Sequence, residues 1–282
     1  MTDREDQKPE PRWWDTSSAY RKANEDIEFL NRDELRPVRL QLELLKPELT
    51  LQKRRIRSTI VVFGGTRIVE PAEARRRLAA LAQESAAKPD DQVLARRLAA
   101  AHRVVEKSRF YDEARRFGAL VSQANDKDDA HDFVIMTGGG PGIMEAANRG
   151  AWDVGAESIG LNITLPHEQE PNRYITPELC FQFRYFAIRK MHFLLRARAL
   201  VAFPGGYGTM DELFEALTLV QTQKIDPLPI VLMDRAFWDG AIHFDHLVDE
   251  GVIDPGDINL FHYAETAQEA WDWIREFWNN GG

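Results

Sequence analysis

Two glycine-rich segments each follow a short run of apolar residues, at Gly138–Gly142 (GGGPG) and at Pro204–Thr209 (PGGYGT). Glycines let the backbone come close to a ligand, and the free amides at a helix start, aided by the helix dipole, favour a phosphate. The first segment has neither the GxGxxG spacing of dinucleotide-binding folds nor the GxxxxGK[ST] spacing of a P-loop. Spacing alone therefore leaves two interpretations open, phosphate-binding loops or tight turns that hold no ligand.

A carboxylate, Glu212, follows the second glycine segment in the sequence TMDE. The T-x-x-E spacing fits a capping box, in which Thr209 and Glu212 only close the start of a helix. We expect Glu212 in the first helical turn, where the helix dipole favours the ionised carboxylate. Beside a phosphate-binding rim, such a carboxylate could instead stabilise a developing cation or activate a water molecule.

Two adjacent cations, Arg189 and Lys190, lie in a helical pattern that also places Tyr185, His192 and Arg196 on one polar face with Arg189. A planar guanidinium and a compact ammonium can together grip a phosphate. The alternative is an ordinary solvated helix face.

The elements that must position these residues alternate between apolar runs and helical patterns. The apolar runs predict five buried strands, at Thr59–Phe63, Asp132–Met136, Ser158–Thr164, Leu200–Phe203 and Pro229–Met233. Helical patterns cover Pro71–Glu84, Asp91–Glu106, Ser108–Ala124, Pro141–Asp153, Arg184–Arg198, a segment after Thr209 up to about Gln223, and two further helices. This alternation predicts an α/β fold with a Rossmann-like, doubly wound parallel sheet covered by helices. Because the carboxyl ends of such strands form the ligand crevice, these two glycine turns and a third, Gly64-Gly65-Thr66 after the first strand, should share one rim.

Residues 1–56 differ in composition from the rest of the chain, because they are polar and interrupted by prolines. Weak helical periodicity at Ala23–Leu30 and Val38–Leu51 predicts a helical N-terminal extension whose first dozen residues are mobile. Residues 57–282 then form the Rossmann-like domain, which we expect to bind an anionic ligand.

The composition excludes several classes of protein. A net charge of -9 and an isoelectric point near 5.4 argue against binding to nucleic acid or an anionic membrane. The single cysteine, Cys180, excludes a disulfide framework, and the spaced pair His243 and His246 is interpreted as a helix-surface pair, so no metal site is expected. The chain has no apolar run long enough to span a membrane and no secretory signal, so we expect a cytoplasmic protein.

Taken together, the segments Thr137–Asn148, Arg189-Lys190 and Pro204–Glu212 resemble the LOG family, whose hallmark is PGGxGTxxE preceded by an Arg-Lys pair. The resemblance covers about Thr59 to Glu250 and is that of a longer bacterial-type member. It implies hydrolysis of the N-glycosidic bond of a nucleoside 5′-monophosphate, of the AMP or cytokinin riboside type, which releases the base and ribose 5-phosphate. It implies no cofactor.

The resemblance also implies roles for individual residues. Arg189 and Glu212 match the catalytic pair of the family. The residues that match its phosphate- and ribose-binding positions are Gly139, Gly140, Gly142, Gly205, Gly206, Gly208, Thr209 and Lys190. Met144 and Arg67 are weaker candidates for the base side or the rim. The family assembles at least as dimers, so a homodimer or higher homo-oligomer is expected. The alternative is a non-catalytic nucleotide or cofactor carrier on the same fold.

Overall fold

The computed structural model describes residues 12–15, 17–124, 132–166 and 170–280. The chain divides into two compact units, Met1–Lys46 and Pro47–Gly282. The helical patterns predicted near the N-terminus are confirmed as α1 (Ile27–Leu30) and α2 (Arg36–Lys53). The predicted mobility of the first dozen residues falls almost wholly on residues 1–11, which lie outside the described residues, and the division at residue 56 stays a prediction.

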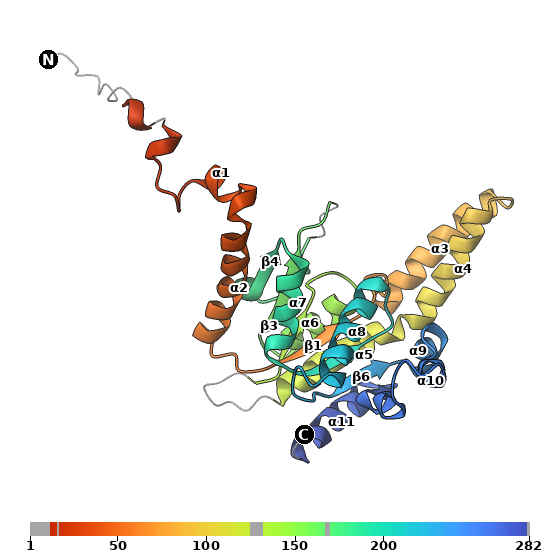
Figure 1. The fold of residues 1–282 in the computed structure, drawn as a ribbon. Coiled ribbons are helices and arrows are strands. Elements are labelled where there is room, and N and C mark those ends of the chain that lie inside the picture. Colours follow the sequence, from red (N-terminus) through yellow and green to blue (C-terminus); the bar gives the residue numbers. More distant parts are fainter. Residues whose placement is uncertain (1–11, 16, 125–131, 167–169, 281–282) are drawn as a thin grey trace. The chain divides into compact units, whose positions relative to one another are not determined.

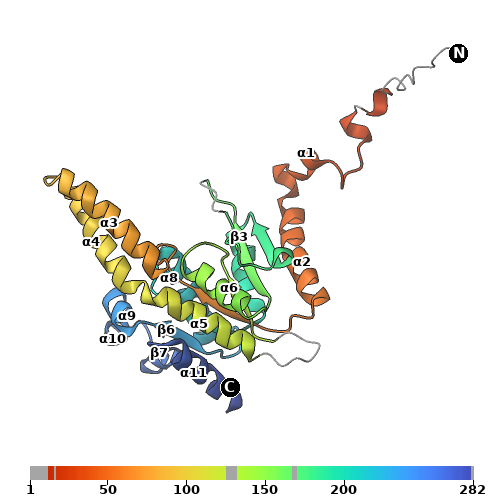
Figure 2. The ribbon, with the colours of Figure 1, turned by 180° about the vertical axis from the view of Figure 1, so that it is seen from behind.

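The second unit contains a seven-stranded sheet in which every strand runs parallel to its neighbours (Figures 1 and 2). The strands are β1 (Thr59–Phe63), β2 (Val134–Thr137), β3 (Ser158–Ile163), β4 (Cys180–Phe183), β5 (Ala197–Ala202), β6 (Ile230–Met233) and β7 (His262–Ala264), in the order β4-β3-β2-β1-β5-β6-β7. The expected Rossmann-like, doubly wound sheet is therefore confirmed.

The five strands predicted from apolar runs are the five central ones, and the two that the sequence analysis missed, β4 and β7, lie at the edges. In β4, Cys180–Phe183, every second residue is buried, while β7 has only three residues. Edge strands need no continuous apolar run because one of their sides has no neighbouring strand.

The strand order reverses between β1 and β5. From β1 the chain adds β2, β3 and β4 on one side, and it then returns to place β5 on the other side of β1. The two strands pair up to their last residues, with Phe63 opposite Ala202. Ligands bind outside the carboxyl ends of the strands at such a switch point. The glycine segment Pro204–Thr209 begins two residues after the end of β5.

Helices cover both faces of the sheet because alternate strand residues point to opposite sides. On one face, α5 (Arg109–Gln123), α6 (Ile143–Asp153) and α11 (Ala267–Asn279) pack against strand residues such as Ile60 and Val201. On the other face, α7 (Phe186–Leu195), α8 (Tyr207–Gln221), α9 (Arg235–Ala241) and α10 (Phe244–Asp249) cover residues such as Val61 and Leu200. The tryptophan-rich C-terminal segment thus contributes to the core of this unit through Trp271 and Ile274.

Two long helices, α3 (Pro71–Ala87) and α4 (Gln92–Lys107), form an antiparallel hairpin between β1 and α5 (Figure 1). They confirm the helical patterns predicted for this segment. In the part of the chain that the structure describes, no helix is long and apolar enough to cross a membrane.

Candidate functional site

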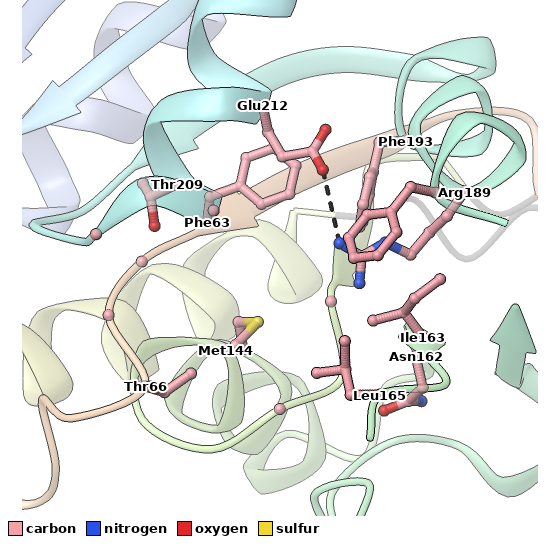
Figure 3. A pocket seen from close by; sticks show the side chains of 17 residues that line it. Phe63, Thr66, Met144, Asn162, Ile163, Leu165, Arg189, Phe193, Thr209 and Glu212 are labelled. Carbon is pink, nitrogen blue, oxygen red and sulfur yellow. Dashed lines mark ion pairs between the residues drawn. The ribbon is translucent and has the colours of Figure 1, made fainter. Parts of the chain in front are cut away.

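A cavity of about 330 Å³ opens at the carboxyl ends of the central strands, where the strand order reverses (Figure 3). Its walls come from the turn after β1, the β2–α6 loop, the end of β3, helix α7 and the start of α8. The lining residues are Phe63, Gly64, Gly65, Thr66, Gly138, Gly140, Met144, Asn162, Ile163, Leu165, Phe186, Arg189, Phe193, Gly206, Gly208, Thr209 and Glu212. The predicted rim therefore exists, and it brings both glycine segments to one cavity.

Arg189 enters the cavity from α7. Its guanidinium lies 5.1 Å from the ring centre of Phe186 and 5.5 Å from that of Phe193, so aromatic faces flank the cation. The side chain is only 14% exposed, and its Nε atom is buried without a hydrogen bond to any described residue. Burial lowers the pKa of Arg189, although the nearby Glu212 opposes that shift. A guanidinium nevertheless remains charged at neutral pH, so the cavity holds a partly desolvated cation.

Glu212 faces Arg189 across the cavity, with its Oε1 atom 3.6 Å from Nη2 of Arg189 (Figure 3). This ion pair is longer than a hydrogen bond. The carboxylate is 6% exposed. Burial raises the pKa of Glu212 to about 7, and the positive charges of Lys190 and Arg189 partly offset the rise. A carboxyl with a pKa near neutrality can take or release a proton at physiological pH.

The capping interpretation of Glu212 is wrong. Helix α8 begins at Tyr207 with Gly206 as its N-cap, three residues earlier than a Thr209 cap would require. Glu212 therefore lies in the second turn, away from the unpaired amides that a capping carboxylate would reach. Burial raises the pKa of Glu212, which is opposite to the lowering expected from the helix dipole.

Lys190 does not line the cavity, contrary to its predicted place in the phosphate site. Successive residues on a helix differ by about 100° in direction, so Lys190 turns away from Arg189 toward α8. There its Nζ atom lies 2.8 Å from Glu215, 3.0 Å from Asp211 and 3.9 Å from Glu212. The two cations therefore have different surroundings. Arg189 lines the cavity, and Lys190 binds the carboxylates of α8.

The alternative of a solvated polar face on this helix is also wrong. His192 is buried, and α7 ends at Leu195, before Arg196. Arg196 forms an ion pair with Glu48 and donates a hydrogen bond to the Ile56 carbonyl at 3.0 Å.

The two glycine segments contribute unequally to the cavity. Of the predicted glycines, Gly140, Gly206 and Gly208 line it together with Thr209, whereas Gly139, Gly142 and Gly205 do not. Gly142 has instead a structural reason to be glycine. Its φ is +74°, and a Cβ atom there would come within 2.4 Å of the Gly65 carbonyl oxygen. The helix predicted to start at Pro141 starts at Ile143, because this left-handed glycine is its N-cap.

Met144 lines the cavity as expected from its place in the first turn of α6. Arg67 does not line it and is exposed, so the weak prediction for that residue is not supported by its position.

The apolar and amide part of the wall was not predicted from the sequence. The residues of this part that were not predicted are Phe63, Asn162, Ile163, Leu165, Phe186 and Phe193. A signal existed for some of them, because Phe63 closes a predicted strand and Asn162 and Ile163 end another, where rim residues should lie. For Phe186 and Phe193 the signal was their spacing, because residues three before and four after Arg189 in a helix lie beside it.

The side chains that line the cavity determine which reactions it can support. Within the described ranges, no three His, Cys, Asp or Glu side chains gather where they could hold a metal ion. No described lysine lines the cavity, and pyridoxal phosphate enzymes need a lysine for the Schiff base. What the cavity offers is a carboxylate, a cation, glycine backbone and an apolar wall.

Sequence comparisons bear on the same residues. A family model described as "possible lysine decarboxylase" matches residues 144–274, which include Arg189 and Glu212. The cytokinin riboside 5′-monophosphate phosphoribohydrolase LOG3 of Arabidopsis thaliana is 30% identical over 164 residues, covering 56% of this chain and 74% of the relative. The probable phosphoribohydrolase LOGL3 of Oryza sativa subsp. japonica is 29% identical over 153 residues, covering 51% and 68%.

Among solved structures, a molybdenum cofactor binding protein from Rippkaea orientalis aligns with 60% of this chain and 87% of its own, at 19% identity and a TM-score of 0.43. Similarity at that level does not determine a shared function.

Proposed function

This chain belongs to the LOG family, and from that membership and the geometry of the cavity we propose that it hydrolyses the N-glycosidic bond of a nucleoside 5′-monophosphate. The products would be the free base and ribose 5-phosphate. The observation that carries the proposal is the ion pair of the mostly buried Arg189 and the buried Glu212, 3.6 Å apart in a cavity that both glycine segments also line.

Glu212 is assigned to the ribose. Glycosidic cleavage passes through a transition state that resembles an oxocarbenium ion, so positive charge develops on the sugar. A carboxylate with 6% exposure has little water to screen it, and its negative charge would lower the energy of that state. The same carboxylate can orient the attacking water and accept its proton, because its pKa of about 7 is close to the working pH.

Arg189 is assigned to the leaving base, on which negative charge accumulates as the bond breaks. Its guanidinium is held between the rings of Phe186 and Phe193, and its Nε donor is free of any described partner. The glycine backbone at Gly140, Gly206 and Gly208 is assigned to the 5′-phosphate, whose binding would orient the reacting bond.

The name of the matching family model points to a different reaction, lysine decarboxylation. The lining of the cavity does not favour it, since no described lysine faces the cavity and Lys190 is bound to the carboxylates of α8. The non-catalytic carrier has no feature of the structure in its favour and is an outcome of the test below.

The test is incubation of the purified protein with AMP, GMP, CMP and isopentenyladenosine monophosphate, with the free base and ribose 5-phosphate quantified separately. We expect equal amounts of both products from at least one substrate. Nucleotide binding without release of base from any of the four would support the carrier and contradict the proposal. The preferred base, a role in cytokinin biosynthesis and the cytoplasmic location stay predictions.

We also propose that the protein forms a homodimer or higher homo-oligomer through α7 and α8. These helices expose large apolar side chains, namely Phe186, Met191, Leu195 and Phe214. Met191 and Leu195, four residues apart, share one face of α7, and exposed apolar side chains of this kind mark an interaction surface. Phe186, which lines the cavity, lies half a turn around α7 from Leu195.

A further inference from the structure

The carbonyl groups of the first glycine segment are bound by a residue from a distant loop. Asn172 follows β3 by nine residues, and its Nδ2 atom donates hydrogen bonds to the carbonyl oxygens of Gly139 and Gly140, each at 3.2 Å. Its backbone amide also donates to the Gly139 carbonyl, at 2.9 Å. Asn172 is 9% exposed. One side chain therefore fixes two consecutive peptide groups.

Asn172 belongs to a closed ring of buried hydrogen bonds around Gly139. Its Nδ2 also lies 3.0 Å from Oδ1 of Asn148, so the two N–H groups are shared among three acceptor oxygens. The Asn148 Oδ1 atom accepts the Thr137 hydroxyl at 2.7 Å. The Thr137 hydroxyl oxygen in turn accepts the Gly139 amide at 3.0 Å. Gly139 is thus held at both its N–H and its C=O. Thr137, Asn148 and Ser158, the residue that accepts from Asn148 at 2.9 Å, are fully buried.

This ring determines where the amide of Gly140 points. In a planar trans peptide the C=O of one residue and the N–H of the next point in opposite directions. Since the Gly139 carbonyl is drawn toward Asn172, the Gly140 N–H is directed the opposite way. Gly140 lines the cavity, and no described residue accepts a hydrogen bond from its amide. Asn172 itself does not line the cavity.

We propose that Asn172 is a positioning residue of the site, which holds the Gly139–Gly140 peptide so that its N–H meets the 5′-phosphate of the substrate. The inference rests on the proposed function, since that function supplies the phosphate. Buried networks in which each member is satisfied keep one geometry, and a donor that is already oriented binds an anion without a further ordering cost.

The experiment measures phosphate binding and turnover separately in Asn172→Ala and Asn172→Asp. Binding of ribose 5-phosphate is followed by calorimetry, and hydrolysis is followed as kcat and KM. We expect both variants to raise the Kd for ribose 5-phosphate and the KM about ten- to hundredfold, which is the loss of a few hydrogen bonds. We expect kcat to change by less than about threefold, because the reacting bond is not touched.

Asn172→Asp adds a pH dependence of the Kd, which a merely structural role of Asn172 would not produce. A carboxylate cannot donate to the two carbonyls, but a protonated carboxyl donates one hydrogen bond. The ratio of variant to wild-type Kd should therefore shrink as the pH falls from 8 to 5, whereas the ratio for Asn172→Ala should stay constant. The matched control is Asn279→Asp, an exposed position at the end of α11, for which no change in Kd is expected.

Thr137→Val provides a second variant, should the buried Asn172 substitutions fail to fold. This substitution removes the hydrogen bond from the Gly139 amide to the Thr137 hydroxyl, so the Kd for ribose 5-phosphate should also rise. A folded Asn172→Ala with unchanged Kd and KM would overturn the inference, and so would a loss confined to kcat. If the wild type binds ribose 5-phosphate yet releases no base, the proposed hydrolysis fails while the Kd comparison still tests Asn172.

Discussion

At the scale of single residues, the proposed hydrolysis depends on the protonation of Glu212. Burial raises the pKa of this carboxyl to about 7, so the free protein retains its proton below pH 7 and loses it above. If the ionised form stabilises the developing cation, kcat/KM should rise about tenfold per pH unit up to pH 7 and then level off. The measurement is kcat/KM between pH 5 and pH 9. A profile that stays flat between pH 5 and pH 8 would contradict the assignment.

The phosphate of the substrate also titrates near pH 6, so Lys190 offers the control that separates the two groups. Lys190 lies 3.9 Å from Glu212 and also binds Glu215, and its positive charge lowers the pKa of Glu212. We expect Lys190→Gln to move the acidic limb of the profile to higher pH, because loss of this positive charge raises the pKa of Glu212 while the pKa of the substrate phosphate is unchanged. Lys53→Gln, at an exposed position of α2, should leave the limb in place. An unshifted limb in Lys190→Gln would assign the limb to the substrate.

At the scale of elements, the site depends on how closely the turn after β1 approaches the start of α6. We expect Gly142→Ala to lower the free energy of unfolding by about 1–3 kcal/mol and to reduce base release, because the new Cβ would be strained and would also collide with the Gly65 carbonyl. Chemical denaturation measures this loss. Gly155→Ala is the matched control, since Gly155 has a φ of +73° but open space around its Cβ. Equal losses in the two variants would exclude the collision as a cause.

The elements also show which parts of the structure could be predicted from the sequence. Central strands such as β1 are buried on both faces and are therefore continuous apolar runs, which made them and the rim predictable. The edge strand β7, with three residues including an exposed His262, has no such pattern. Arg189 and Glu212 were found through a motif. The contacts of Lys190 with the carboxylates of α8, and the pKa of Glu212, depend on the packing of α7 against α8 and could not be predicted from the sequence.

At the scale of the whole molecule, the chain carries a net charge of -9. Its cavity nevertheless holds the mostly buried cation of Arg189, paired with Glu212. The exposed apolar side chains of α7 and α8 provide a test of the proposed assembly. We expect light scattering after gel filtration to give at least twice the 32.3 kDa of one chain. Leu195→Glu should shift the protein toward the monomer, because a charge at an apolar contact is costly. Val93→Glu, an exposed apolar position on α4, should not. A monomeric wild type would contradict the assembly.

The most direct test of the central claim compares base release by the wild type with release by Glu212→Ala under saturating nucleoside 5′-monophosphate. The account predicts that kcat falls about 10³-fold, since both charge stabilisation and the proton acceptor are removed. Glu215→Ala is the control, because Glu215 lies on the same helix and also contacts Lys190 but does not line the cavity. It should keep activity within about tenfold of the wild type. Full activity in Glu212→Ala would contradict the account.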